Sequence, residues 1–288
     1  MNRLAATLLA VLSAVLGGCP ADPTGLGPNP LVGNRRMPGR IDPNDARSGT
    51  AKPGRYVLVA RLRLVTIEVP VGTASGSEEI WSYLDEEPVS AIRSASLGRN
   101  GLRVGLGRED SWPDLARIFK RMTGRSPKQN LVVAVPGDPL PIVLKERQQI
   151  QTIFTFYDDR TLSGADYPPG DNVLAVVCTL NEDDLSKLMI TVMPQVRSTR
   201  HRTRFVMGQT GPRMVSTAEV FNFPHLTFRL TVPSKDFLVI GPGAHSRRPT
   251  SVGHHFLVKK KEGMEFETLL VLIPEVFAAP ARSRRGGG

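Results

Sequence analysis

Apolar and polar residues alternate in a strand-like pattern at the start of the ordered part of the chain. In the segment 56–69 (YVLVARLRLVTIEV), Leu62 and Leu64 fall on one side of an extended backbone, and Arg61 and Arg63 fall on the other. Successive side chains of a strand point to opposite faces, so this spacing predicts a long strand.

One segment has the three-to-four-residue spacing of apolar positions that predicts a helix, at 111–123. Ser111 can cap it, Pro113 suits its first turn, and Gly124 ends it. A shorter helix is expected at 77–84. The apolar stripe of the longer helix consists of Leu115, Ile118, Phe119 and Met122.

From residue 130 onward, short apolar runs are separated by turns rich in Gly, Pro and Asp. This pattern is typical of an antiparallel β-rich fold. The chain is therefore predicted to be α+β and predominantly antiparallel β, with a small mixed α/β N-terminal part and a β-rich C-terminal domain. The expected strands are 131–135, 142–145, 150–157, 173–180, 187–196, 215–221, 226–232, 237–240, 255–258 and 266–273, preceded by one at 102–106 after an Asn-Gly turn.

The amino-terminal segment reads as an export signal. A positive charge at Arg3 precedes an uncharged run rich in Leu, Ala and Val, which is too short to be a permanent membrane span. The next residues, Leu16-Gly17-Gly18-Cys19, resemble the bacterial lipobox, which implies that Cys19 carries a lipid anchor. The alternative is an ordinary signal peptide and a disulfide to Cys178. Cys178 lies in an apolar run that is typical of a buried strand, so we favour the lipid.

Composition divides the chain into five segments. Residues 20–54 contain seven prolines and six glycines without apolar periodicity, which predicts a disordered tether. The expected organisation is a lipoprotein signal peptide (1–18), the tether (19–55), a small α+β domain (56–145), a β-rich domain (146–280) and a disordered basic tail (281–288).

The net charge of +10 is concentrated in two runs without acidic residues, 197–218 and 237–261. Such runs are either solvated loops or a basic face that binds an anionic glycan or lipid. Aromatic residues hardly interleave with the basic ones, which argues against single-stranded nucleic acid. The candidate anion-binding residues are Arg197, Arg200, Arg202, Arg204, Arg213, Arg247, Arg248, Lys259, Lys260 and Lys261.

No sequence pattern indicates catalysis, a metal or a cofactor. The chain has no phosphate-binding glycine loop and no His-Glu-x-x-His motif. His254 and His255 are adjacent, so on the expected strand they would face opposite sides and could not share one metal ion. The acidic and aromatic segment 81–87 could serve an envelope hydrolase, but no nucleophile–base pair accompanies it, and structural capping is the preferred interpretation. We expect a protein that is not an enzyme.

Three segments of the β-rich half resemble the secretin family, the ring-forming outer-membrane channels of secretion and pilus systems. They are 188–196 (LMITVMPQV), 232–243 (VPSKDFLVIGPG) and 268–276 (TLLVLIPEV), and the likeness extends over 173–277. The resemblance implies a secretin-core-like β domain that takes part in an assembly. The chain departs from the family because it lacks room for the usual series of amino-terminal ring domains.

Together these features predict an envelope lipoprotein with a structural or assembly role. Its partners would be a membrane, through the lipid on Cys19, and either an envelope protein or further copies of itself, but not nucleic acid. Pro20 stands where an aspartate can signal inner-membrane retention, which favours the periplasmic face of the outer membrane. The alternative is a periplasmic binding module for an anionic glycan or lipid that uses the loops 197–213 and 245–261.

Overall fold

The computed structural model describes residues 56–280 except 158–160, 182–183 and 209–210. Cys19 with its lipobox, the signal peptide, the tether and the tail 281–288 lie outside the described residues, so these assignments stay predictions. Within the described ranges, no helix is long and apolar enough to cross a membrane.

The first sheet has six antiparallel strands in the order β2-β11-β13-β1-β3, with β12 added to β13. Its central pair, β1 and β13, is aligned over fifteen positions, from Tyr56 opposite Pro280 to Pro70 opposite Phe266. One member of this pair comes from the expected α+β part, the other from the expected β-rich part. The strands are β1 (Tyr56–Pro70), β2 (Leu102–Gly107), β3 (Lys128–Ala134), β11 (Phe237–Pro242), β12 (Val258–Lys261) and β13 (Met264–Pro280).

The second sheet has the strand order β10-β8-β7-β4, and β9 pairs with the outer part of β8. A separate two-stranded sheet joins β5 and β6. Every pairing between these strands is antiparallel, which confirms the predicted fold class. The strands are β4 (Pro139–Gln148), β5 (Gln151–Phe156), β6 (Leu162–Tyr167), β7 (Gly170–Leu180), β8 (Lys187–Gly208), β9 (Gly211–Asn222) and β10 (Phe228–Pro233).

Short helices complete the fold. The longest, α3 (Trp112–Thr123), ends as predicted at Gly124, whose φ of 66° lies in the left-handed region that glycine tolerates. The other α-helices are α1 (Glu78–Trp81), α2 (Ala91–Arg99) and α4 (Val252–Leu257), and the 3₁₀ turns are η2 (Glu109–Ser111), η3 (Pro224–Leu226) and η4 (Ala244–Arg247).

The centre of the first sheet is buried on both faces, which explains why the sequence of β13 is continuously apolar over 269–273. Leu270 and Leu272 belong to a hydrophobic cluster shared with β7, β8 and β10 of the second sheet. Leu269, Val271 and Ile273 belong to a different cluster, shared with α3. Because strand side chains alternate, an unbroken apolar run fills both cores at once.

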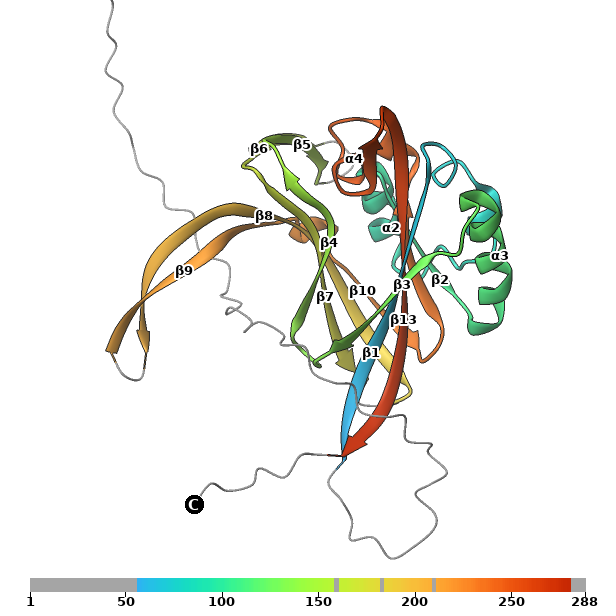
Figure 1. Cartoon of the computed structure of the whole chain (residues 1–288), viewed down its shortest axis with the longest axis horizontal. Coiled ribbons are helices and arrows are strands. Elements are labelled where there is room, and N and C mark those ends of the chain that lie inside the picture. Colours follow the sequence, from blue (N-terminus) through green and yellow to red (C-terminus); the bar gives the residue numbers. More distant parts are fainter. Residues whose placement is uncertain (1–55, 158–160, 182–183, 209–210, 281–288) are drawn as a thin grey trace, which may run out of the picture. The chain divides into compact units, whose positions relative to one another are not determined.

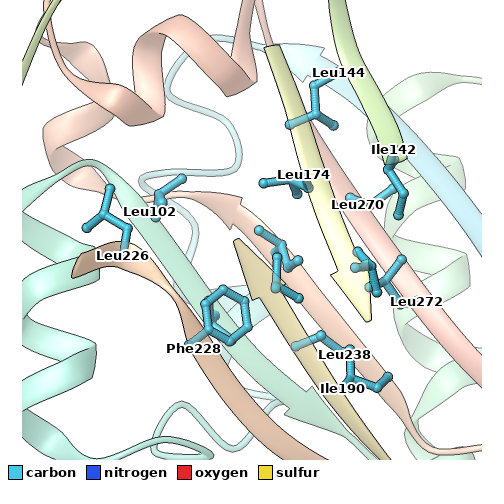
Figure 2. Close-up of a cluster of buried hydrophobic side chains, with 14 of the residues drawn as sticks. Leu102, Ile142, Leu144, Leu174, Ile190, Leu226, Phe228, Leu238, Leu270 and Leu272 are labelled. Carbon is cyan, nitrogen blue, oxygen red and sulfur yellow. The ribbon is translucent and has the colours of Figure 1, made fainter. Parts of the chain in front are cut away.

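Figure 2 shows the core between the two sheets. Leu270 and Leu272 of β13 and Leu238 of β11 lie among side chains from the second sheet, including Leu174 of β7 and Ile190 of β8. The layers are therefore a helical layer, the first sheet and the second sheet. The ends and edges of the second sheet lie outside this core between the sheets.

Several local predictions were wrong, and the strand β6 was not expected. Residues 255–257 lie in the helix α4 rather than in a strand, because Ser251 caps a turn that buries Phe256. The basic segments 197–213 and 245–261 were expected as loops, but the described part of the first belongs to β8 and β9, and the second contains η4, α4 and β12. The helix α2 was not expected, because Leu97 is its one buried side chain, and a single core contact gives no apolar stripe.

Candidate functional site

The most distinctive feature is a two-stranded arm formed by β8 and β9. β8 pairs with β10 as far as Val192 and with β7 as far as Ser198. Beyond Thr199, in the described part of the chain, it pairs with β9 alone. We call residues 200–208 and 211–219 the arm. Figure 1 shows β8 and β9 leaving the other strands of their sheet as a separate ribbon.

The arm has one apolar face near its tip. The register places Phe205 opposite Met214 and Met207 opposite Pro212, and directly opposed residues share a face. Phe205, Met207 and Met214 are 78%, 81% and 68% exposed. These large apolar side chains lie close together on a protruding ribbon and contribute nothing to the core.

The opposite face of the arm is basic. Arg202 lies opposite Thr217, and Arg213 lies opposite Val206, so both arginines occupy the face that Phe205 does not. Arg202 forms an ion pair with Glu219 at 2.7 Å. Arg200 is exposed, and the side chain of Arg204 lies outside the description.

The root of the arm is closely packed. The ladder between β8 and β9 is irregular between Arg197 and His201, where β8 leaves the second sheet. A Cβ on Gly170 of β7 would lie 2.2 Å from the Arg197 carbonyl oxygen, so only glycine allows the two strands to approach here. Arg197 itself is half-buried beside Gln195, and this burial lowers its pKa.

A second exposed apolar surface lies on β3, at the edge of the first sheet. Leu131 and Val133 point to one face of this strand and are 44% and 47% exposed. β3 pairs with β1, and in the described part of the chain its other edge pairs with no strand. A free edge with apolar side chains is a surface on which another strand can pair.

A basic cleft lies between β4 and the segment that contains α4 and β12. It has a volume of about 770 Å³ and contains Lys145, His254 and His255 together with the three lysines of β12. Lys259 and Lys261 both form ion pairs with Glu68 of β1. Burial alone would raise the pKa of Glu68, but the two lysines outweigh it and lower that pKa.

Lys145 of β4 is partly buried in this cleft. Burial, together with the nearby charge of Lys259, lowers its pKa to about 8. Its Nζ donates a hydrogen bond to the His254 carbonyl oxygen at 2.9 Å. Burial also lowers the pKa of both histidines, that of His255 to about 4, so both rings are neutral at pH 7.

The structure distributes the ten predicted anion-binding residues over three places. Five arginines lie on β8 and β9, and Lys259, Lys260 and Lys261 line the cleft. Arg247 ends η4, and Arg248 stacks over the Phe156 ring at 5.9 Å. The sequence interpretation missed Lys145, because it is more than a hundred residues from β12 and lies in a strand with no basic run.

The acidic and aromatic segment 81–87 has a structural role in the described chain. Trp81 is buried and donates a hydrogen bond from Nε1 to the Ala74 carbonyl oxygen at 3.1 Å. The Arg103 guanidinium stacks over the Trp81 ring at 4.4 Å and pairs with Glu86. Another glutamate of this region, Glu79, pairs with Arg121 of α3. Glu79 and Glu86 are thus paired with arginines, while Asp85 accepts a hydrogen bond from the Glu87 backbone N–H.

The described residues include no group of three His, Cys, Asp or Glu side chains that could hold a metal ion. Cys178 is free and buried in β7, and burial raises its pKa to about 12. Fold and surface together define a two-sheet α+β protein with a protruding ribbon.

No protein-family model and no curated protein matches the chain. Among solved structures it bears a weak resemblance to secretin domains. It is similar to the InvG secretin domain β-barrel of the Salmonella SPI-1 injectisome (9% identity, 79% of this chain, 63% of that chain, TM-score 0.19). It is also similar to the Vibrio cholerae type IV competence pilus secretin PilQ (12% identity, 76% of this chain, 57% of that chain, TM-score 0.20).

This chain thus spans 63% and 57% of the length of these two structures. At such TM-scores the overlays carry no argument about function. The function is therefore argued from this chain's own surfaces.

Proposed function

We propose that this protein is a non-catalytic structural subunit of a cell-envelope assembly, anchored by lipid on Cys19 and joined to further copies of itself through the arm. The observation that carries the proposal is the arm, with Phe205, Met207 and Met214 exposed on one face. The lipobox at 16–19 supports the anchor, and Pro20 favours the periplasmic face of the outer membrane.

The arm needs a partner for a physical reason. A ribbon of two strands is at best marginally stable in water, because it buries little surface and leaves both edges unpaired. β8 has 22 residues, which corresponds to about 70 Å of strand. Contact with another protein surface would bury the apolar face and pair at least one edge of the ribbon.

A second copy of this chain offers a suitable surface. The free edge of β3 carries the exposed side chains of Leu131 and Val133, and these come from a different sheet than the arm. Two different surfaces that bind each other produce head-to-tail association, which closes into a ring or continues as a filament. This geometry supports repeated assembly rather than a two-fold dimer.

The experiment compares the native mass of the full chain with that of an arm variant. The chain is solubilised from membranes in mild detergent, and its mass is measured by light scattering on a sizing column. The variant carries Phe205→Ser, Met207→Ser and Met214→Ser. We expect oligomers for the wild-type chain and monomers for the variant. The variant should still unfold cooperatively, because these side chains lie outside the core.

The matched control is Ile92→Ser on α2, since Ile92 is 85% exposed but lies away from the arm. This variant should assemble like the wild-type chain. A wild-type chain that is monomeric at every concentration tested would contradict the proposal, as would an arm variant that assembles normally.

A further inference from the structure

The cleft beside β4 carries an excess of positive charge that the fold itself does not balance. Four lysines line it, against the two carboxylates of Glu146 and Glu265. Glu68 offsets one more positive charge through Lys259 and Lys261. Within the described ranges, no carboxylate forms an ion pair with the Lys145 ammonium group, which is partly buried.

Lys145 also has donors to spare. An ammonium group offers three N–H donors, and the hydrogen bond to the His254 carbonyl oxygen uses one of them. A partly desolvated ammonium group with two further donors gains from contact with a negatively charged acceptor. Both the charge and the donors of Lys145 therefore suit an anion as the ligand of this cleft.

We propose that this cleft binds a phosphate-bearing ligand, with Lys145 at its centre and Lys259 and Lys260 at its rim. No arginine lines the cleft, so the cleft lacks the planar guanidinium group that binds a carboxylate at two points. Lysines act as point charges on their stems and suit a phosphate group, whose several oxygens accept bonds from different directions. A volume of about 770 Å³ accommodates a phosphate together with the molecule that carries it.

The two histidines make binding sensitive to pH. His254 Nδ1 lies 3.1 Å from the Ser246 carbonyl oxygen, and His255 Nε2 lies 3.1 Å from the Thr152 carbonyl oxygen. A neutral ring that donates there has its other nitrogen without a proton. After burial, the charge of Lys145 is the next cause that lowers the pKa of both rings, while Lys259 lowers the pKa of Lys145 and Glu265 raises those of Lys145 and His254. Lys260, Lys261 and Glu146 also line the cleft. An anion bound among these groups raises the pKa of each ring and of Lys145.

Because the bound anion favours the protonated forms, binding takes up protons, and affinity rises as the pH falls. This site is independent of the proposed assembly function, since none of its lining residues lies on the arm or on β3. The phosphate could belong to a soluble phosphate ester or to a lipid headgroup, and the two sources require separate probes.

The first probe is inorganic phosphate, titrated into the detergent-solubilised full chain by calorimetry. We expect saturable binding that is about tenfold or more weaker in Lys145→Met. The pH dependence is measured with sulfate, which stays a dianion across the range, and its binding should be at least several-fold tighter at about pH 6 than at about pH 8.5. Lys120→Met, which removes an exposed charge from α3, is the matched control and should bind like the wild-type chain. Lys260→Met provides a second test should Lys145→Met fail to fold.

The second probe is a vesicle that contains phosphatidic acid, compared with one of neutral lipid only. If the wild-type chain binds the phosphatidic acid vesicle and Lys145→Met does not, the ligand is a lipid headgroup. If the chain binds free phosphate but not the vesicle, the ligand is a soluble phosphate ester. Absence of saturable binding to either probe overturns the proposal, and so does equal binding by the wild-type chain and Lys145→Met. The arm variant should retain phosphate binding, so failure here is distinguishable from failure of the assembly proposal.

Discussion

β13 and the arm are both long β-strand structures, yet their apolar side chains differ in exposure to solvent. The run 269–273 of β13 is buried on both faces, with alternate side chains in two separate cores. In the arm, Phe205 and Met207 are exposed on one face and arginines occupy the other. The same extended backbone thus contributes to the stability of the core in β13 and forms an exposed surface in the arm.

The difference shows what tertiary context adds to a strand. β13 receives its stability from neighbours on both sides, which hold its apolar side chains away from water. The arm has one neighbour, and its apolar side chains have no core to enter. We therefore expect substitutions in β13 to lower the free energy of unfolding and substitutions in the arm to change association.

The largest effect should come from Leu270→Ala in β13. The side chain is 1% exposed and sits between the two sheets, so its removal should lower the free energy of unfolding by about 2–5 kcal/mol. Phe205→Ala in the arm should change it by about 0.5 kcal/mol or less. Denaturant unfolding of both variants measures the contrast, and equal losses would refute the division between core and arm.

Gly170→Ala, at the point where the two regions meet, should cost about 1–3 kcal/mol. The new methyl group would meet the Arg197 carbonyl oxygen at 2.2 Å, so β7 and β8 would have to separate at the root of the arm. Thermal unfolding measures the loss. The native mass should fall as well, because the arm would change direction; a stable variant with wild-type assembly would contradict this account.

Acid should destabilise the fold through His255 of α4. The folded-state pKa of His255 is lowered to about 4, so between about pH 6.5 and pH 4 the unfolded chain binds more protons. Stability should fall as the pH falls through this window, by about 1–2 kcal/mol, since His255 is partly solvated. Unfolding at several pH values tests this, with His255→Gln expected to flatten the dependence.

The smallest expected effect is a gain. Gly98 lies within α2, and a Cβ there would meet no atom within 4 Å. Gly98→Ala should therefore raise the free energy of unfolding by about 0.5–1 kcal/mol, because alanine favours the helix. A loss of stability in the same unfolding assay would show that α2 is not helical in solution.

Those parts of the fold that depend on local pattern could be predicted from sequence. The helix α3 has its apolar stripe, a proline in its first turn and a glycine at its end, and each signal acts within a few residues. The apolar run of β13 likewise predicts a buried strand. By contrast, β1 and β13 were assigned to different parts of the chain, because no local signal reveals that two strands two hundred residues apart form one pair.

The candidate sites could be predicted only in fragments. The arm was not predicted, because the arginines of 200–204 were interpreted as a basic loop. The apolar residues that alternate along the arm, Phe205, Met207 and Met214, were therefore not recognised as part of a strand pair. The lysines of β12 were noted as a basic run, but the cleft depends on Lys145, which the fold brings to them from β4. A run of basic residues in the sequence identifies candidate residues, but the residues that complete a site are brought to them by the tertiary structure.

The pairing of β1 with β13 also determines when this protein can fold. Arg61 and Glu275, which bond across the pair, are 214 positions apart in sequence. Closing so long a loop is entropically costly, and folds dominated by such distant contacts form slowly. The first sheet cannot close until its last strand, β13, has been synthesised. Until then β1 lacks its partner strand in the nascent chain. A nascent chain stalled before β13 would expose the apolar side chains of β1 to proteases and chaperones.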